Sequence, residues 1–249
     1  MLCGMSTSRR AIRAIFFDAG NTLLRMNYGD IAAALSRLGV ALTVDAIQRA
    51  EWRARVRLDT DVLGAAAAST ESLSTADRYL RFVLAELGIA DEGTVAAGTA
   101  WRRAYNVPGG LFNVVEPCAE AALRAARDAG LTAAVISNSN GTVRSLLAGL
   151  GLTRYLDFVV DSGEVGVEKP DPRIFRLALA RASVAPSEAL YVGDLYSVDV
   201  LGARAAGLDA ILIDPGGCWG TRDCVSAPDV LAAVGHVVDG DAARARDDQ

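Results

Sequence analysis

The 249-residue sequence predicts an α/β fold, a doubly wound parallel sheet that is interrupted after its first strand by a helical insert. Three observations support this prediction. An apolar run ending at Phe17 leads into an acidic turn, residues 28–106 show only helical periodicity, and strand-like segments alternate with helix-like segments after them. Strands that alternate with helices connect through right-handed crossovers and form a parallel sheet with helices on both faces.

The first strand is expected at residues 9–17, which are rich in β-branched and aromatic side chains. Apolar residues then recur at helical spacing in four segments, 28–39, 43–58, 74–88 and 91–106. Several of these segments begin with Thr, Ser or Asp and end near Gly, as helices usually do. The chain crosses into this insert near Arg25 to Gly29, and the Pro/Gly-rich stretch at 106–110 indicates a second hinge.

The rest of the sequence alternates between the two kinds of element. Helices are expected at 116–130, 141–151, 171–183 and 197–207, and strands at 131–140, 155–162, 189–195 and 209–217. We therefore predict a discontinuous core domain at 9–26 and 109–240, a helical cap domain at 27–108, and a polar, frayed tail at 241–249.

The composition narrows the class of protein. With 51% hydrophobic residues and a net charge of −5, the chain has no composition suited to a polyanion, so nucleic acid is not expected as a partner. No apolar run is long enough to span a membrane, and no signal-peptide pattern opens the chain, so we expect a cytoplasmic protein. The four scattered cysteines indicate reduced thiols. Of the 25 basic residues only Lys169 is a lysine, which suggests that a compact ammonium is needed at that position.

Polar residues follow several of the predicted strands at the point where each strand ends. Asp18 follows the first strand, Ser137 and Asn138 lie in the turn that closes the second segment, and Asp194 closes a later one. Lys169 lies in the loop "GVEKPDP" between strands. Ligands of open parallel sheets bind at the carboxyl ends of the strands, so these side chains are expected at one edge of the sheet.

This set of groups suits phosphoryl transfer. Asp18 can attack phosphorus and form an aspartyl-phosphate, which divides a difficult hydrolysis into two steps. Asp18 and Asp194 together can hold Mg²⁺, and the backbone carbonyl of Gly20 can supply a further oxygen. Asp199, five residues after Asp194, can orient either a metal-bound water or Lys169.

Other groups at this edge can bind the phosphoryl oxygens, where negative charge gathers in the transition state. The candidates are Ser137, Asn138, Lys169 and the turn amides at Ala19 and Gly20. The insert is the expected specificity element, and Arg25 and Tyr28 are its polar residues nearest the crevice.

Four segments resemble, in order, the four motifs of the haloacid dehalogenase-like (HAD) hydrolase superfamily. They are "FFDAGNTL", "VISNS", "GVEKPDPRIF" and "YVGDLYSVDVLGARAAG". The helical insert lies where the C1 α-helical cap of subfamily I lies. The resemblance implies a Rossmann-like core, Mg²⁺ as cofactor and a small phosphorylated substrate. It also implies a nucleophile and metal ligand at Asp18, a phosphate binder at Ser137, a neutralising cation at Lys169, and metal-site acids at Asp194 and Asp199.

One position departs from the phosphatase pattern of this superfamily. An Asp two residues after the nucleophile would protonate the leaving oxygen, and this chain has Gly20 there. A positioned acid or base contributes about 10²–10⁴-fold, which is roughly 3–5.5 kcal/mol of activation barrier. We therefore expect a slowed or specialised catalyst in which a good leaving group, the substrate or a cap residue compensates.

Three functions stay open at this point. The favoured one is a Mg²⁺-dependent phosphohydrolase. A second is a catalytically weak or vestigial binding protein of the same fold. A third is a metal-independent 2-haloacid dehalogenase, which is disfavoured because Asp194 and Asp199 would repel Asp18 without a cation. Phosphonatase chemistry through a cap lysine is excluded, because the insert contains no lysine. Neither the substrate nor the oligomeric state follows from the sequence.

Overall fold

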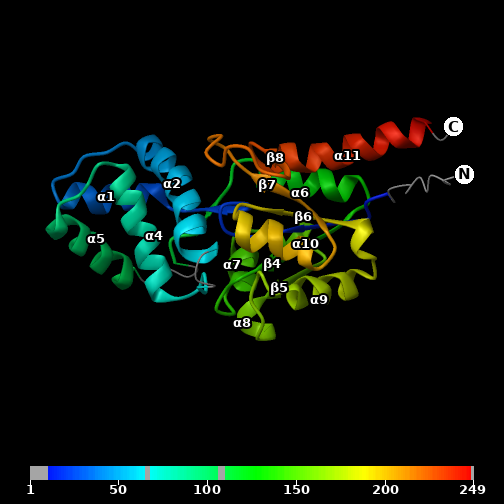
Figure 1. Cartoon of the computed structure of the whole chain (residues 1–249), viewed down its shortest axis with the longest axis horizontal. Helices are drawn as coiled ribbons and strands as arrows, with labels where there is room; N and C mark the ends of the chain where they lie inside the picture. The colour runs from blue at the N-terminus through cyan, green and yellow to red at the C-terminus, as the bar shows by residue number, and fades with distance from the viewer. Residues whose placement is uncertain (1–10, 65–67, 106–109, 248–249) are drawn as a thin grey trace, which may run out of the picture.

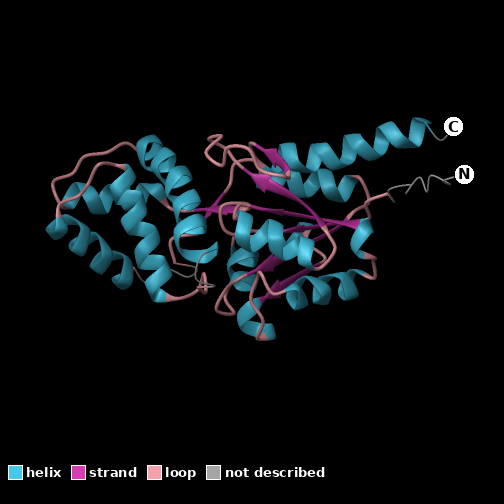
Figure 2. Ribbon diagram, in the orientation of Figure 1, coloured by secondary structure: helices cyan, strands magenta, loops and turns pink. Residues whose placement is uncertain are grey.

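The computed structural model describes residues 11–64, 68–105 and 110–247. Two lobes are evident in Figure 1, a lobe of helices at the left and a larger α/β lobe that contains both ends of the chain. In Figure 2 the strands of the larger lobe lie between layers of helices. None of the described helices is long and apolar enough to cross a membrane.

The core is a parallel sheet whose strands are ordered β5-β4-β1-β6-β7-β8. The strands are β1 (Ala14–Phe17), β4 (Thr132–Ser137), β5 (Phe158–Asp161), β6 (Ala189–Gly193), β7 (Asp209–Ile213) and β8 (Val225–Ala227). β1 lies in the centre, with Phe17 in register with Val135 of β4 and Val192 of β6. The carboxyl ends of β1, β4 and β6 therefore meet at one edge.

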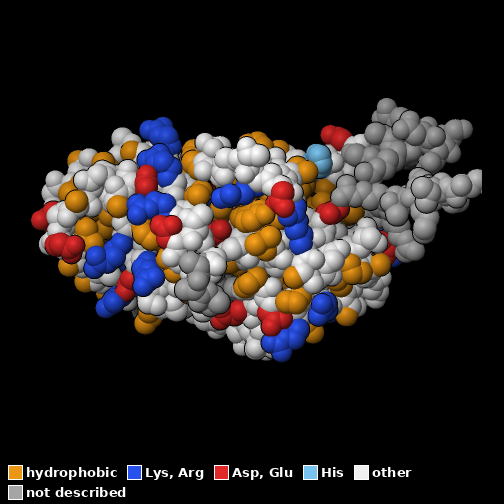
Figure 3. Space-filling view, viewed as in Figure 1, with side chains coloured by type: hydrophobic (Ala, Val, Ile, Leu, Met, Phe, Trp, Pro, Cys, Tyr) orange, Lys and Arg blue, Asp and Glu red, His pale blue; other side chains and the backbone are white. Residues whose placement is uncertain are grey.

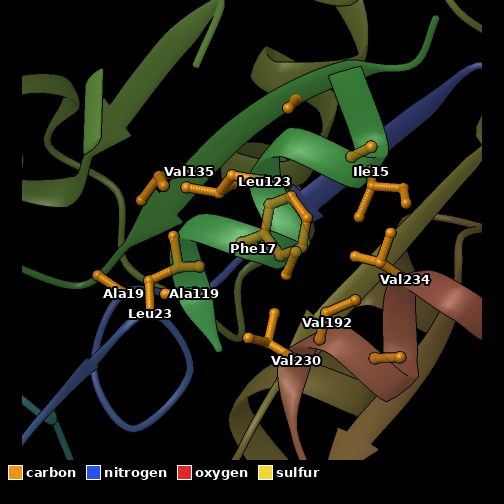
Figure 4. Packing of buried hydrophobic residues seen from close by; sticks show 14 of the residues in the cluster. Ile15, Phe17, Ala19, Leu23, Ala119, Leu123, Val135, Val192, Val230 and Val234 are labelled. Carbon is orange, nitrogen blue, oxygen red and sulfur yellow. The ribbon is translucent and has the colours of Figure 1, made fainter. Parts of the chain in front are cut away.

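Every residue of β1 is fully buried, because helices cover both faces of the sheet. Ile15 and Phe17 point into one apolar layer, while Ala14 and Phe16 point into the other. Figure 4 shows the first layer, in which Phe17 packs beside Leu123, Val135 and Val230. This alternation is the period-2 geometry of a strand that is covered on both sides.

The helices of the core divide between these two layers. The first layer includes side chains from α6 (Ala119–Asp128), α7 (Val143–Gly149) and α11 (Val230–Asp247). The second includes side chains from α9 (Pro172–Ala182) and α10 (Leu201–Ala205). Shorter elements complete the core, namely η2 (Leu152–Tyr155), α8 (Ser162–Val165), η3 (Pro186–Glu188) and η4 (Tyr196–Val200).

The helical lobe, which we call the cap, lies between β1 and β4 in the sequence. Its helices are α1 (Tyr28–Arg37), α2 (Val44–Leu58), η1 (Asp59–Leu63), α4 (Leu73–Glu86) and α5 (Glu92–Ala104). Thr43, Ser72 and Asp91 cap three of these helices, each accepting a hydrogen bond from a backbone amide three residues later. The four helices predicted from periodicity are all present, and their buried side chains form an apolar core that also includes Leu195 and Val198 of the larger lobe.

A small sheet at the joint was not predicted from the sequence. β2 (Leu24–Arg25) pairs antiparallel with β3 (Val114–Val115), where the chain enters and leaves the cap. Two-residue strands are too short to give a periodic pattern in the sequence. Their pairing becomes visible only when the fold brings the two ends of the cap together. Of the second predicted hinge, residues 106–109 lie outside the described residues.

The sequence prediction also differs from the structure at the two ends of the core. The first strand begins at Ala14 rather than at residue 9, and residues 9 and 10 lie outside the described part. β8 and α11 were not predicted, and α11 continues as far as Asp247 through most of the segment expected to be a frayed tail. The polar composition of that segment hides a helix, which contributes Val230, Ala233, Val234 and Val237 of its first half to the apolar core.

Gly163 supplies a stability test, because backbone surrounds the position that a Cβ would occupy. That Cβ would lie 2.6 Å from the Gly141 nitrogen and 2.7 Å from the Asn140 carbonyl carbon. Overpacking of this kind costs about 1–3 kcal/mol, so Gly163→Ala should lower the melting temperature by about 2–12 °C. Gly149→Ala is the matched control, since its Cβ would meet nothing within 4 Å. Equal melting temperatures for the two variants would contradict the prediction.

Candidate active site

The carboxyl ends of β1 and β6 and the loop before α9 converge on one ammonium group. The Lys169 Nζ lies 2.6 Å from Asp18 Oδ1, 2.8 Å from Asp199 Oδ1 and 2.8 Å from the hydroxyl oxygen of Tyr191. All four side chains are buried. The structure thus places the only lysine of the chain against the acid that follows the first strand.

Asp199 anchors both this lysine and the loop after β6. Its Oδ1 accepts a hydrogen bond from Lys169, and its Oδ2 accepts hydrogen bonds from the backbone amides of Asp194 and Leu195. Both carboxylate oxygens are therefore engaged by protein groups. The sequence left two roles open for Asp199, orienting a metal-bound water or orienting Lys169. This geometry favours the second role.

The turn after β4 is tied to the lysine loop through Asn138. The Asn138 side chain accepts from the Lys169 amide at 2.7 Å, and it donates to the Lys169 carbonyl at 2.9 Å. It also donates to Thr70 of the cap at 2.9 Å. Ser137 is buried and donates to the Asn138 carbonyl at 3.2 Å.

Two residues at the end of β5, Asp161 and Ser162, hold the turn after β4 in place, and sequence reasoning did not single them out. Asp161 accepts hydrogen bonds from the amides of Gly141, Gly163 and Val143, and it is fully buried. The Ser162 hydroxyl accepts from the Ser139 amide and donates to the Ser139 carbonyl. An acidic residue at the end of a buried strand was the available signal.

The cap contributes a buried polar cluster that closes over the end of β6. Arg55 forms a bidentate ion pair with Glu51, and its Nε lies 3.5 Å from Asp194 Oδ2. Tyr28 and Tyr79 both donate to Glu51, while Asn21 donates to Tyr79 and to Asp194 at 3.1 Å. The charged segment from Glu51 to Arg57 has the composition of a solvated helix face, so sequence reasoning did not single out Arg55 or Glu51.

Burial sets the proton affinities of these groups. It raises the pKa of Asp18 to about 6, although the Lys169 charge pulls that value down. It also raises the pKa of Asp194 well above its ordinary range against the opposing effect of Arg55. Burial disfavours the ammonium of Lys169, but Asp18 and Asp199 outweigh it and raise the pKa of the lysine. The raised pKa values of Asp18 and Asp194 mean that the protein supplies too little positive charge to balance these two carboxylates.

The balance of charges fits a divalent cation. Hydrogen bonds and ion pairs connect four carboxylates with two cations, namely Asp18, Asp194, Asp199 and Glu51 with Lys169 and Arg55. With every carboxylate ionised, two negative charges are uncompensated, which is why the pKa values of Asp18 and Asp194 rise when no further cation is bound. Carboxylate oxygens of Asp18, Asp194 and Asp199 all lie within 4.8 Å of one another. Oxygen-rich sites with excess negative charge are the kind that Mg²⁺ occupies. The residues present therefore fit the predicted metal.

Gly20 lies in the turn after the nucleophile position, and an aromatic ring fills the space beside it. A Cβ at Gly20 would lie 3.5 Å from the Phe112 ring, which is an ordinary contact distance. Phe112 follows the cap and packs with the apolar residues of the cap. The place of the missing acid is therefore apolar.

Tyr191 is another residue that sequence reasoning missed, and it is testable. Its hydroxyl bridges Lys169, Asp199 and the Ile136 carbonyl, so it joins β6 to β4 beneath the ammonium. Hydrogen bonds to charged groups contribute about 1.5–3 kcal/mol, and we expect Tyr191→Phe to lower the free energy of unfolding by that amount. Chemical denaturation measures it, with Tyr155→Phe at the exposed Glu120 contact as control. A smaller loss for Tyr191→Phe than for the control would refute the expectation.

Comparison with known proteins defines the class to which this fold and site belong. The family model for haloacid dehalogenase-like hydrolases matches residues 12–207, a range that includes Asp18, Lys169, Asp194 and Asp199. The chain therefore belongs to the haloacid dehalogenase-like hydrolase family. This confirms the predicted fold, a Rossmann-like core with an inserted cap.

Several curated relatives carry phosphatase names. A ribulose-1,5-bisphosphate 5-phosphatase of Halopiger xanaduensis is 36% identical over 215 residues, covering 81% of this chain and 84% of the relative. A phosphoserine phosphatase of Thermus thermophilus is 42% identical over 144 residues, covering 56% of this chain and 55% of the relative. The chain thus spans only about half the length of the Thermus relative.

Solved structures agree with the fold. The magnesium-bound structure of the Bacillus subtilis protein YfnB superimposes with a TM-score of 0.60 at 18% identity, covering 92% of this chain and 100% of that chain. A 2-haloacid dehalogenase of Pseudomonas syringae superimposes with a TM-score of 0.53 at 25% identity, covering 94% and 99%. Phosphatase and dehalogenase members of the family share this architecture, so the chemistry has to be argued from the site.

Proposed function

We propose that this protein is a Mg²⁺-dependent phosphohydrolase that acts on a small phosphorylated metabolite through an aspartyl-phosphate at Asp18. The excess of two negative charges around Asp18 and Asp194 is the observation that carries the proposal. A dehalogenase that works without metal would have to keep these buried carboxylates close together with no cation to balance them. The phosphatase-named relatives support the same choice.

Asp18 is the nucleophile in this proposal. Lys169 holds Oδ1 of its carboxylate at 2.6 Å, so we assign the attack on phosphorus to Oδ2. The ammonium offsets the charge of both nucleophile and phosphoryl group, and Asp199 and Tyr191 fix its position. Ser137 and the amides of the turn after Asp18 bind the phosphoryl oxygens.

Asp18, Asp194 and the backbone carbonyl of Gly20 would hold Mg²⁺, with Asp199 behind them. When bound, the metal would supply positive charge to the nucleophile and to the phosphoryl oxygens. The protein residues perform the remaining tasks. The cap excludes water, with Arg55 reaching Asp194 and Asp59 accepting hydrogen bonds from the amide and hydroxyl of Ser197.

The absence of an acid at position 20 narrows the range of phosphate esters that the enzyme would hydrolyse efficiently. A leaving group of low pKa needs little protonation, so acyl or aryl phosphates should react faster than alkyl phosphates by a wide margin. A linear free-energy plot of kcat/KM against leaving-group pKa measures this dependence.

The test is phosphate release from p-nitrophenyl phosphate and a panel of phosphorylated metabolites, with Mg²⁺ and with EDTA. We expect release that requires Mg²⁺ and is lost in EDTA. Turnover that is unaffected by EDTA would overturn the proposal and direct the assay to 2-haloacids. Mg²⁺ binding without turnover on any compound of the panel would favour a binding protein instead.

A further inference from the structure

A pocket of about 160 Å³ lies at the joint between cap and core, beside the catalytic site. Helix α2 of the cap, the turn after Asp18 and the loops after β7 and β8 enclose it. Asp18, Ser137 and Lys169 do not line it. Asn21 and Arg55 do, and both also contact Asp194 Oδ2. The pocket is therefore a neighbour of the reacting centre rather than part of it.

The residues of its inner wall carry buried polar atoms that have no partner. Five such side-chain atoms occur in the described part of the chain, and three belong to this wall, namely Asn21 Oδ1, Thr22 Oγ1 and Arg55 Nη1. An unsatisfied buried group costs about 1–3 kcal/mol. These atoms are themselves inaccessible, so they make the wall polar, while the groups that can meet a ligand are the charged side chains at the mouth of the pocket.

Two opposite charges in the same pocket also lack partners. Arg25 of β2 and Glu116, directly after β3, both line it and are both half-buried. Neither side chain makes a hydrogen bond or an ion pair with another described residue. Burial raises the pKa of Glu116 despite the opposing pull of Arg25 and Arg55, as expected for a carboxylate without a close cation. The pocket thus offers one free cation and one free acid.

The outer part of the pocket is apolar and small. Trp52 forms one wall together with Ile213 and Val230. A Cβ at Gly216 would come within 2.8 Å of the Trp52 ring, so the loop after β7 packs tightly against this side chain. A protein cavity of about 150 Å³ accepts benzene, so this pocket has room for a ligand of about six non-hydrogen atoms.

We propose that this pocket binds a small zwitterion of the amino-acid class. Its ammonium would pair with Glu116 and its carboxylate with Arg25, because these two half-buried charges line the pocket. A short apolar side chain would rest on Trp52.

Such a ligand has two sources. It is either the leaving end of a phosphorylated amino acid or a free amino acid that regulates the enzyme. Binding itself does not depend on the proposed phosphatase activity, because the pocket does not include the nucleophile. The ligand would nevertheless influence the active site, since Asn21 and Arg55 link its wall to Asp194.

Isothermal titration calorimetry of the full-length protein tests the proposal with L-alanine, propionate and isopropylamine. We expect L-alanine to bind at least about 10-fold more tightly than either compound that lacks one of its charges. Equal affinities for L-alanine and propionate, or no binding of L-alanine, would overturn the proposal and leave the pocket to water. This comparison uses the wild-type protein, so it does not depend on whether any variant folds.

Variants locate the site. Glu116→Gln should remove the preference for L-alanine over propionate, and Arg25→Gln should weaken both at least about 10-fold. Glu92→Gln and Arg78→Gln, at exposed cap positions outside the pocket, are the matched controls. Unchanged affinities in both pocket variants would place the ligand elsewhere and refute the assignment.

Kinetics distinguish the two sources. If L-alanine raises only KM for p-nitrophenyl phosphate, it occupies the leaving end of the substrate site. If it changes kcat, it is a separate effector. If calorimetry shows L-alanine in the pocket but no phosphate ester turns over, the proposed function fails while the ligand assignment holds.

Discussion

Asp18→Asn should abolish phosphate release while leaving the fold intact. The amide has nearly the shape of the carboxylate but cannot attack phosphorus, and it removes a charge that the proposed metal requires. Removal of a nucleophile or its acid partner from a hydrolase costs on the order of 10⁴–10⁶-fold in kcat. The measurement is kcat for p-nitrophenyl phosphate in Mg²⁺, together with the melting temperature of the variant. Asp128→Asn, at an exposed position on α6, is the control.

The covalent step gives this prediction a second readout. Acid-quenched wild-type protein should retain ³²P from a labelled substrate, and Asp18→Asn should retain none. Turnover of the variant within about 10-fold of wild type would show that another group attacks phosphorus. Unfolding of the variant is not expected, because Lys169 keeps its contacts with Asp199 and Tyr191.

The sequence predicted those features of the site that depend on strand order. Asp18 and Asp194 follow buried strands, and the carboxyl ends of neighbouring parallel strands must lie side by side, so their meeting follows from topology. The rare lysine was also a useful signal, and Lys169 lies 2.6 Å from Asp18. Regular periodicity likewise predicted all four long helices of the cap.

Features that depend on how the cap docks on the core could not be predicted in this way. Arg55 lies in an arginine-rich helix whose spacing fits a solvated face, yet its side chain is 3% exposed. Its burial depends on Glu51, Tyr79 and Asp194, which come from two cap helices and a core loop. A local pattern contains no information about such a contact. The β2–β3 pair is hidden for the same reason, since each strand has only two residues.

A carboxylate restored at position 20 should accelerate hydrolysis of substrates with poor leaving groups. The backbone at Gly20 is not in the left-handed region, and a Cβ there would meet Phe112 at 3.5 Å, so the main chain accepts a side chain. The three atoms nearest to that Cβ all belong to the Phe112 ring. We therefore expect Gly20→Asp alone to be partly hindered, and Gly20→Asp with Phe112→Ala to show the full effect.

A positioned general acid contributes about 10²–10⁴-fold, and this gain in kcat/KM is expected for alkyl phosphates in the double variant. p-Nitrophenyl phosphate should gain little, because its leaving group departs without a proton. The matched control is the double variant Gly20→Asn with Phe112→Ala, because the amide has the shape of the carboxyl group but cannot act as the general acid. Equal kcat/KM values of the two double variants for alkyl phosphates would show that the function missing at position 20 is not proton transfer. A gain confined to the Asp pair, and to poor leaving groups, would mean that the lysine and acid framework around Asp18 is catalytically complete except for this single proton donor.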